Sequence, residues 1–263
     1  MKKKVIYYSD LLNDEFSGTN INAVELGEDF VFINKNPIWR FFAFILYYFF
    51  AFPLVALFCF FYLHLRVKNK NVLREFRRKG FFLYGNHTGF YDAFVHSVIN
   101  FPKKSYVIAN RDATSIRGLR QIVMMLGALP IPNNIQGMKK FTQAVEKRWQ
   151  EKKCITVFPE AHIWPYYNKI RPFPATSFRF PVKLNSPVIA LVTTYRRRKG
   201  PFKNCRPYAT VHLSEPFYPD PHLPLKEAQI NLRNRVFDWM ENCLETKGSY
   251  EYVRYEYRQN KNP

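Results

Sequence analysis

Residues 81–94 read FFLYGNHTGFYDAF, an apolar run that passes through a polar turn into the start of a helix. The run FFLYG (81–85) predicts a buried strand, because a short apolar run bounded by turn residues is typical of a strand covered on both faces. The same order of strand, turn and helix recurs along the chain, and it indicates the fold class.

Five more strand-like runs follow, at 105–109, 128–131, 154–158, 187–195 and 208–213. Two helices are predicted by apolar residues spaced three and four apart, over 135–149 and 225–243. Strands that alternate with helices predict an α/β fold, with a mostly parallel or mixed sheet flanked by helices. Functional residues of such sheets gather beyond the carboxyl ends of the strands, where NHTGFYD and FPEAHIW fall.

The composition bounds the class of protein. A chain of 263 residues is long enough for one sizeable α/β domain. The net charge of +20 implies an anionic partner: nucleic acid, an anionic bilayer surface, or a phosphorylated or thioester-carrier substrate. The four cysteines are scattered without metal-like pairs, which indicates free thiols in a reducing compartment.

The segment from Phe41 to Leu63 contains no charged residue over 23 positions. About 20 apolar residues suffice to cross a bilayer as a helix, so we expect membrane attachment rather than a core helix. Pro53 predicts a kink or a hairpin that turns back within one leaflet. Cationic residues crowd the carboxyl-terminal flank and place the following domain on the cytoplasmic face; they are Arg66, Lys68, Lys70, Arg74, Arg77, Arg78 and Lys79.

The chain therefore divides into four predicted segments. A polar lead-in (1–36), with a short strand at DFVFI (29–33), precedes a membrane-embedded segment (37–66). A folded domain (67–250) and a polar tail (251–263) follow.

His87 and Asp92 are the first candidates for chemistry. On a continuous helix, five residues correspond to about 500°, so the two side chains would point about 140° apart. They can meet only if His87 lies on the turn before the helix and Asp92 lies in the first helical turn. In that arrangement Asp92 would fix one ring nitrogen as a donor and leave the other free to accept a proton.

Other interpretations of this stretch remain open on its residues alone. Asp92 could simply complement the helix N-terminus, or it could pair with His96, four residues further along. A metal site of His87, Asp92 and His96 is disfavoured. In the second loop, Glu160 follows the strand CITVF and should project above the sheet, where it could hydrogen-bond a substrate hydroxyl.

Four blocks of the chain together resemble the phospholipid/glycerol acyltransferase family, which includes the 1-acylglycerol-3-phosphate acyltransferases. The blocks are NHTGFYD (86–92), LGALPIPNN (126–134), FPEAH (158–162) and SPVIALV (186–192), and the resemblance covers roughly residues 66–215. It implies a glycerolphosphate acyltransferase-like fold and a role in phospholipid biosynthesis.

The resemblance also implies a reaction. An acyl group would pass from a thioester of acyl carrier protein or coenzyme A to an acceptor hydroxyl, without a metal or redox cofactor. His87 would act as the base, Asp92 would orient it, and Glu160 would help to bind the acceptor. Donors at the helix start after His87 would stabilise the oxyanion. The partners would be membrane lipid and the acyl thioester.

This chain departs from the family at three places. Gly89 replaces a common Ser, Asn133 replaces an Arg, and Ala161-His162-Ile163 replace Gly-Thr-Arg. The missing arginines are the expected clamps for an acceptor phosphate. Other cations would then hold the phosphate, with Lys139, Lys140, Lys169 and Arg171 as candidates, or the acceptor carries no phosphate.

Two further hypotheses remain. The first is a degenerate family member that binds lipid or acyl chains without turnover, although retention of His87 and Asp92 counts against it. The second is a membrane-tethered nucleic-acid binder, which we rank last because it rests on charge alone. The basic run YRRRKGPFKNCR (195–206) resembles no nucleic-acid module. We expect that run to form a loop at lipid headgroups.

Overall fold

The computed structural model describes residues 4–17, 25–27, 29–115 and 118–259. Its centre is a seven-stranded sheet in the order β2-β8-β7-β3-β6-β4-β5, in which only the β7–β8 pair is antiparallel. The strands are β2 (Arg66–Lys68), β3 (Phe81–Gly85), β4 (Ser105–Ala109), β5 (Ala128–Pro130), β6 (Cys154–Val157), β7 (Val188–Arg196) and β8 (Tyr208–Leu213). The predicted α/β fold is confirmed, and so are its six predicted strands.

Strand β3 occupies the middle of the sheet. It lies between β7 and β6, where Leu83 pairs with Ile189 on one side and with Thr156 on the other. All five β3 residues are buried. Because neighbouring parallel strands end at the same edge, the turn after β3 lies beside the loop after β6.

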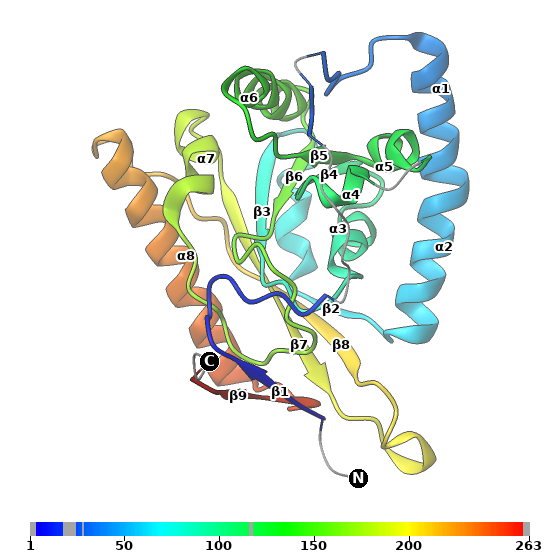
Figure 1. Cartoon of the computed structure of the whole chain (residues 1–263), viewed down its shortest axis with the longest axis vertical. Helices are drawn as coiled ribbons and strands as arrows, with labels where there is room; N and C mark the ends of the chain where they lie inside the picture. Colours follow the sequence, from blue (N-terminus) through cyan, green and yellow to red (C-terminus); the bar gives the residue numbers. More distant parts are fainter. Residues whose placement is uncertain (1–3, 18–24, 28, 116–117, 260–263) are drawn as a thin grey trace.

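Helices cover both faces of the sheet (Figure 1). They are α3 (Asp92–Asn100), α4 (Asp112–Ser115), α5 (Arg120–Leu126), α6 (Ile135–Gln150), α7 (Arg179–Lys183) and α8 (Leu225–Lys247), with short 3-10 turns η3 (Lys70–Arg74), η4 (Ala175–Phe178) and η5 (Gly200–Phe202). Alternate β3 side chains enter two cores, Phe82 packing with Phe141 and Leu232 and Leu83 packing with Val95. This alternation follows from the period of two along a strand.

The two predicted long helices are confirmed as α6 and α8. Ile135, which we assigned to the apolar face of the first, is instead 90% exposed. The strand predicted over 29–33 is wrong. Those residues form a turn and bends, from which Phe32 packs its ring against Phe141 in the core. Burial of single aromatic side chains satisfies the apolar pattern there without sheet pairing.

The apolar segment forms one continuous helical rod along the side of the domain (Figure 1). It comprises α1 (Pro37–Ile45), η1 (Leu46–Ala51), α2 (Phe52–Leu57) and η2 (Phe58–Tyr62), where η1 and η2 are π-helical turns. The N–H of Phe52 bonds to Tyr47 five residues back. This widened turn accommodates Pro53, so the predicted hairpin does not form and the chain stays helical.

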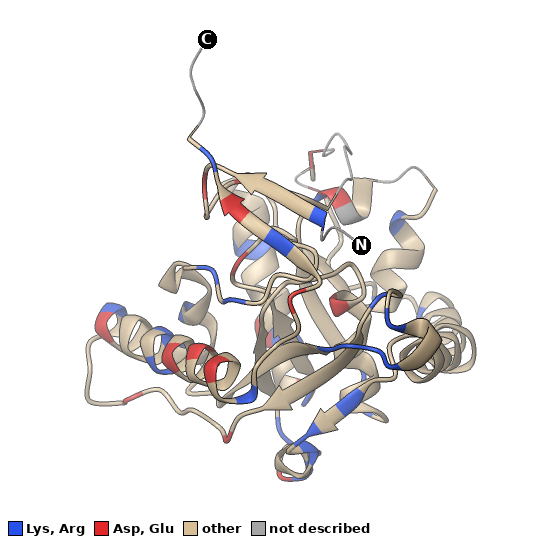
Figure 2. Ribbon diagram, turned by 90° about the horizontal axis from the view of Figure 1, so that it is seen from below, with Lys and Arg blue, Asp and Glu red and all other residues tan. Residues whose placement is uncertain are grey.

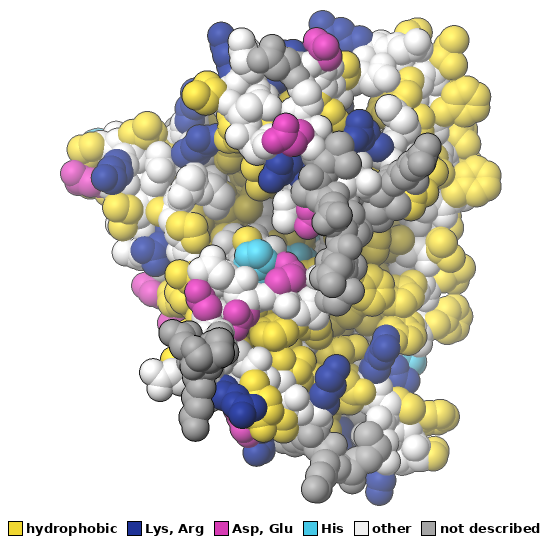
Figure 3. All heavy atoms as spheres, viewed as in Figure 1, with side chains coloured by type: hydrophobic (Ala, Val, Ile, Leu, Met, Phe, Trp, Pro, Cys, Tyr) yellow, Lys and Arg dark blue, Asp and Glu magenta, His cyan; other side chains and the backbone are white. Residues whose placement is uncertain are grey.

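Pro37–Tyr62 is long and apolar enough to cross a membrane, and only 11% of its most apolar stretch is buried. The rod contacts α5 with its first half and α3 with its second half. Figure 3 shows the resulting apolar flank. Its exposed side chains include Phe41, Phe42, Phe49, Phe50, Leu54, Leu57, Phe60 and Phe61.

Two strands near the chain ends were not predicted. β1 (Lys4–Tyr8) and β9 (Val253–Tyr257) pair in parallel as a separate two-stranded sheet. Their pairing connects the predicted polar lead-in to the predicted polar tail. The four-segment division itself stays a prediction.

Candidate active site

His87 lies on the turn after β3, and Asp92 is the first residue of α3. His87 Nδ1 is 3.2 Å from Asp92 Oδ2. The same carboxylate oxygen accepts hydrogen bonds from the backbone N–H groups of Thr88 (2.6 Å) and Gly89 (2.8 Å). The side chain of Asp92 is almost fully buried, whereas that of His87 retains 13% exposure. One oxygen of the Asp92 carboxylate, Oδ2, therefore holds the His87 ring and two backbone N–H groups of the turn.

This arrangement has a consequence for the imidazole. An ionised carboxylate only accepts hydrogen bonds, so Nδ1 carries the proton and Nε2 is left as the acceptor. The ring of His87 also stacks on that of Phe158, with centroids 4.5 Å apart. These two contacts fix the orientation of the imidazole, and its Nε2 atom makes no hydrogen bond to the residues that the structure describes.

His96 is not the partner of Asp92. Neither of its ring nitrogens has a hydrogen-bond partner in the described part of the chain. Burial lowers the pKa of His96 to about 4, so the ring is neutral at pH 7.

The prediction that donors near the helix start stabilise an oxyanion stays a prediction, but two N–H groups there have another role. The N–H groups of Thr88 and Gly89 point at Asp92 and are consumed in holding the turn. Packing explains why position 89 is a glycine. A Cβ atom there would lie 2.6 Å from the ring of Tyr91. A serine at this position would require the buried Tyr91 ring to shift.

A buried hydroxyl chain beneath the turn was missed from the sequence. Tyr91 Oη lies 2.5 Å from Tyr195 Oη, and Tyr195 Oη donates to Thr88 Oγ1 at 2.8 Å. Tyr195 comes from β7, 104 residues away in the chain from Tyr91. Asn86 adds a second tie to β7 by bonding both the N–H and the C=O of Thr193. Only the pairing of β3 with β7 brings these groups together, and no local signal marks Tyr195.

Glu160 follows β6 and is buried. Its Oε2 accepts from the backbone N–H of His87 at 3.2 Å, and its Oε1 accepts from the backbone N–H of Arg171 at 3.1 Å. Burial raises the pKa of Glu160, and the adjacent Arg171 guanidinium opposes that rise. Glu160 therefore links the loop after β6 to the backbone of the His87 turn.

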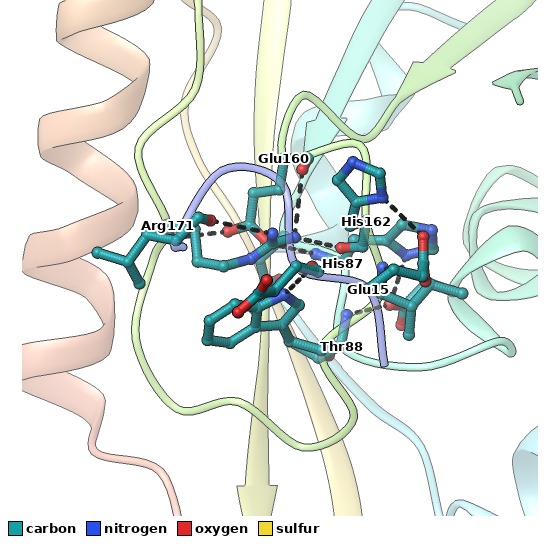
Figure 4. A network of polar contacts seen from close by, with 12 residues as sticks. Glu15, His87, Thr88, Glu160, His162 and Arg171 are labelled. Carbon is teal, nitrogen blue, oxygen red and sulfur yellow. Dashed lines mark hydrogen bonds and ion pairs between the residues drawn. The ribbon is translucent and has the colours of Figure 1, made fainter. Parts of the chain in front are cut away.

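Arg171 is fully buried. Its Nη2 atom contacts Glu160 Oε2 at 3.3 Å and also donates to the carbonyl of His162. The guanidinium lies 4.9 Å from the Trp164 ring centroid. Figure 4 shows these groups converging from the loop after β6. Arg171 therefore binds groups of the loop after β6, and its predicted role in holding the acceptor stays a prediction.

The remaining predicted cations lie elsewhere. Lys139 and Lys140 are exposed on α6, and Lys169 is exposed on the loop before Arg171. The structure brings together His87, Asp92, Glu160 and Arg171, and it leaves these three lysines at the surface.

The lead-in covers the loop after β6. Trp164 Nε1 donates to the carbonyl of Asp14 at 2.7 Å, and His162 Nδ1 is 2.7 Å from Glu15 Oε2. Further along, Asn133 donates to Glu25 Oε1 at 3.0 Å. Two positions that depart from the family, Asn133 and His162, therefore bind carboxylates of this chain's own lead-in.

Comparison with known proteins agrees with this architecture. A sequence model of the family described as Acyltransferase matches residues 64–194, a range that holds His87, Asp92, Glu160 and Arg171. The matched region, residues 64–194, belongs to this acyltransferase family, as the resemblance of the four sequence blocks implied.

A solved structure shares the fold. It is the crystal structure of the 1-acyl-sn-glycerophosphate (LPA) acyltransferase PlsC from Thermotoga maritima, with a TM-score of 0.51 and 15% sequence identity. The similarity covers 81% of this chain and 95% of that chain. No curated protein sequence matches the chain.

Proposed function

We propose that this protein is a membrane-bound O-acyltransferase that uses His87 and Asp92 as a general-base pair. It moves a fatty acyl group from acyl carrier protein or coenzyme A to the hydroxyl of a lipid acceptor, with lysophosphatidate or a related lysolipid as the acceptor. The observation that carries the proposal is the 3.2 Å contact between His87 Nδ1 and Asp92 Oδ2, which leaves Nε2 free.

The proposed reaction requires no metal or redox cofactor. His87 Nε2 takes the acceptor hydroxyl proton while the oxygen attacks the thioester carbonyl. The tetrahedral intermediate then expels the thiolate, which receives that proton from the imidazolium. Well-placed general-base catalysis contributes about 10²–10⁴-fold to a rate. Asp92 stabilises the imidazolium, and Glu160 holds the backbone of His87 by accepting a hydrogen bond from its N–H group.

The acyl chain requires access to a bilayer, and the helical rod over 37–62 supplies an apolar flank for it. Because the rod lies against α5 and α3, the proposed attachment places the domain directly on the membrane surface. The cationic flank after residue 63 supports a cytoplasmic location of the catalytic domain.

The experiment for the general base is a substitution. His87→Ala in isolated membranes is expected to abolish transfer of a labelled acyl group to lysophosphatidate, while circular dichroism stays unchanged. His222→Ala, which removes an exposed histidine, is the matched control. Full activity of His87→Ala would refute the proposed base.

The acceptor needs its own test. If Lys139 and Lys140 bind the acceptor phosphate, Lys139→Gln/Lys140→Gln lowers kcat/KM for lysophosphatidate and spares monoacylglycerol. Arg171→Ala lowers activity equally on both acceptors, because its buried guanidinium supports the loop. The burial of Arg171 favours a second candidate, an acyltransferase whose acceptor carries no phosphate. Preference of the unmodified chain for monoacylglycerol would select that candidate.

A further inference from the structure

The basic run at 195–206 forms the hairpin between β7 and β8, and the base of this hairpin is tied to the carboxyl end of the helical rod. Arg198 Nη2 donates to the carbonyl of Tyr62 at 2.9 Å, and Arg206 Nη1 donates to the Tyr62 hydroxyl at 2.5 Å. Arg196 Nη2 donates to the carbonyl of His64 at 2.7 Å. One guanidinium group therefore caps a carbonyl of the last helical turn, where the helix dipole favours positive charge, and the other two hold the Tyr62 side chain and the residues that follow the helix.

The tip of the hairpin has a different character. Residues 199–205 are all exposed, and Phe202 keeps 60% of its surface accessible. Lys199 and Lys203 flank Phe202, and no carboxylate occurs between residues 196 and 207. An exposed aromatic ring between lysines is unfavourable in water but suits the headgroup region of an anionic bilayer.

The tip lies beyond the carboxyl end of the rod. Figure 1 shows the hairpin reaching past the end of the rod, and Figure 2 views the molecule from that end. Phe60 and Phe61, in the last turn of the rod, are 68% and 65% exposed. The arginine contacts fix the hairpin to this turn, so one lipid surface can receive both.

We propose that the tip of the β7–β8 hairpin is a second membrane anchor. Phe202 enters the interface of the bilayer that holds the rod, while Lys199 and Lys203 contact anionic phospholipid headgroups. This inference rests on the proposed membrane attachment, and it adds a specific contact that orients the domain on the surface.

Cys205 gives a direct readout, because it is exposed whereas Cys59, Cys154 and Cys243 are buried. The full chain, labelled at Cys205 with an environment-sensitive dye, is mixed with phosphatidylcholine vesicles with or without phosphatidylglycerol. A blue shift of the emission is expected with the anionic vesicles. The control is Cys205→Ser/Lys226→Cys, labelled on α8, which should show no shift. Equal spectra at the two positions would overturn the proposal.

Vesicle partition of hairpin variants provides the second test. Lys199→Gln/Lys203→Gln is expected to weaken partition onto anionic vesicles about 30-fold, since each lysine near such a surface contributes about 1 kcal/mol. Phe202→Ser is expected to weaken it about tenfold. Lys4→Gln/Lys226→Gln makes the same charge change at other exposed positions, and Ile135→Ser removes another exposed apolar side chain. Neither control should have an effect.

The outcomes separate this proposal from the catalytic one. Partition is measured without acyl donor, and the hairpin variants should keep full turnover in detergent micelles. Unchanged partition of both hairpin variants would overturn the anchor and leave the acyltransferase proposal intact. Failure of the unmodified chain to bind anionic vesicles, or its displacement from them by an oligonucleotide, would also overturn the anchor.

Discussion

Arg171 Nη2 lies 3.3 Å from Glu160 Oε2, and both side chains are almost completely withdrawn from solvent. Removing one partner of a buried ion pair leaves an uncompensated charge, which typically costs about 3–5 kcal/mol. We therefore expect Arg171→Met to lower the free energy of unfolding by about that amount, measured by urea titration in detergent.

The double variant Glu160→Gln/Arg171→Met should recover part of this loss, because it removes both charges. Arg254→Met, which breaks the exposed pair with Glu251, should cost at most about 1 kcal/mol. If Arg171→Met were no more harmful than Arg254→Met, the pair would not stabilise the loop.

Asp92→Asn tests the orientation of the imidazole. An amide can still accept from the N–H groups of Thr88 and Gly89, so the turn should keep its shape. The loss of the negative charge destabilises the imidazolium, and kcat should fall by at least about 10²-fold. Steady-state acyl transfer measures the effect. Asp238→Asn, on the exposed face of α8, serves as the control. Retention of the wild-type kcat would remove Asp92 from the mechanism.

Tyr195 acts as a positioning residue through Thr88. In Tyr195→Phe, Tyr91 Oη and Thr88 Oγ1 lose their shared partner, a cost of about 1–2 kcal/mol. If this loss distorts the turn that holds His87, kcat decreases about tenfold while KM for the acyl donor changes little. Tyr218→Phe, at a half-exposed tyrosine, is the comparison. A rise in KM at constant kcat would contradict the positioning role.

His96 makes stability depend on pH. Its pKa is about 4 in the folded chain, against an ordinary value of 6.5. Between these values the unfolded chain binds a proton that the folded chain does not, so stability falls as pH drops from 6.5 towards 4. The full contribution is about 3 kcal/mol.

His96→Leu should flatten this part of the pH–stability curve, as measured by urea unfolding at pH 6.5, 5.5 and 4.5. His222→Leu, at an exposed histidine, should leave the slope unchanged. If His96→Leu and the unmodified chain showed the same dependence of stability on pH, that dependence would arise from other titratable groups.

Most of the fold was predictable from the chain itself. The six predicted strands and the two long helices follow from apolar periodicity, which is a local property. Strand β2, with its three residues, is too short to give such a pattern, and β1 and β9 are paired only by contacts between the two ends of the chain. The strand predicted at 29–33 failed because isolated aromatic anchors such as Phe32 look like a strand in sequence.

The amino-acid sequence by itself determined that His87 and Asp92 can meet only if His87 precedes the helix and Asp92 begins it, because helical geometry forbids their contact otherwise. Only the tertiary structure decided what surrounds them. The order of strands in the sheet brings Tyr195 beneath the turn and Glu160 to the backbone of His87. The same packing buries Arg171, a cation that its charge alone would place at the surface. Local periodicity specifies elements, whereas the pairing of distant strands decides which polar groups share a low-dielectric interior, and that pairing is not written in any short stretch of the chain.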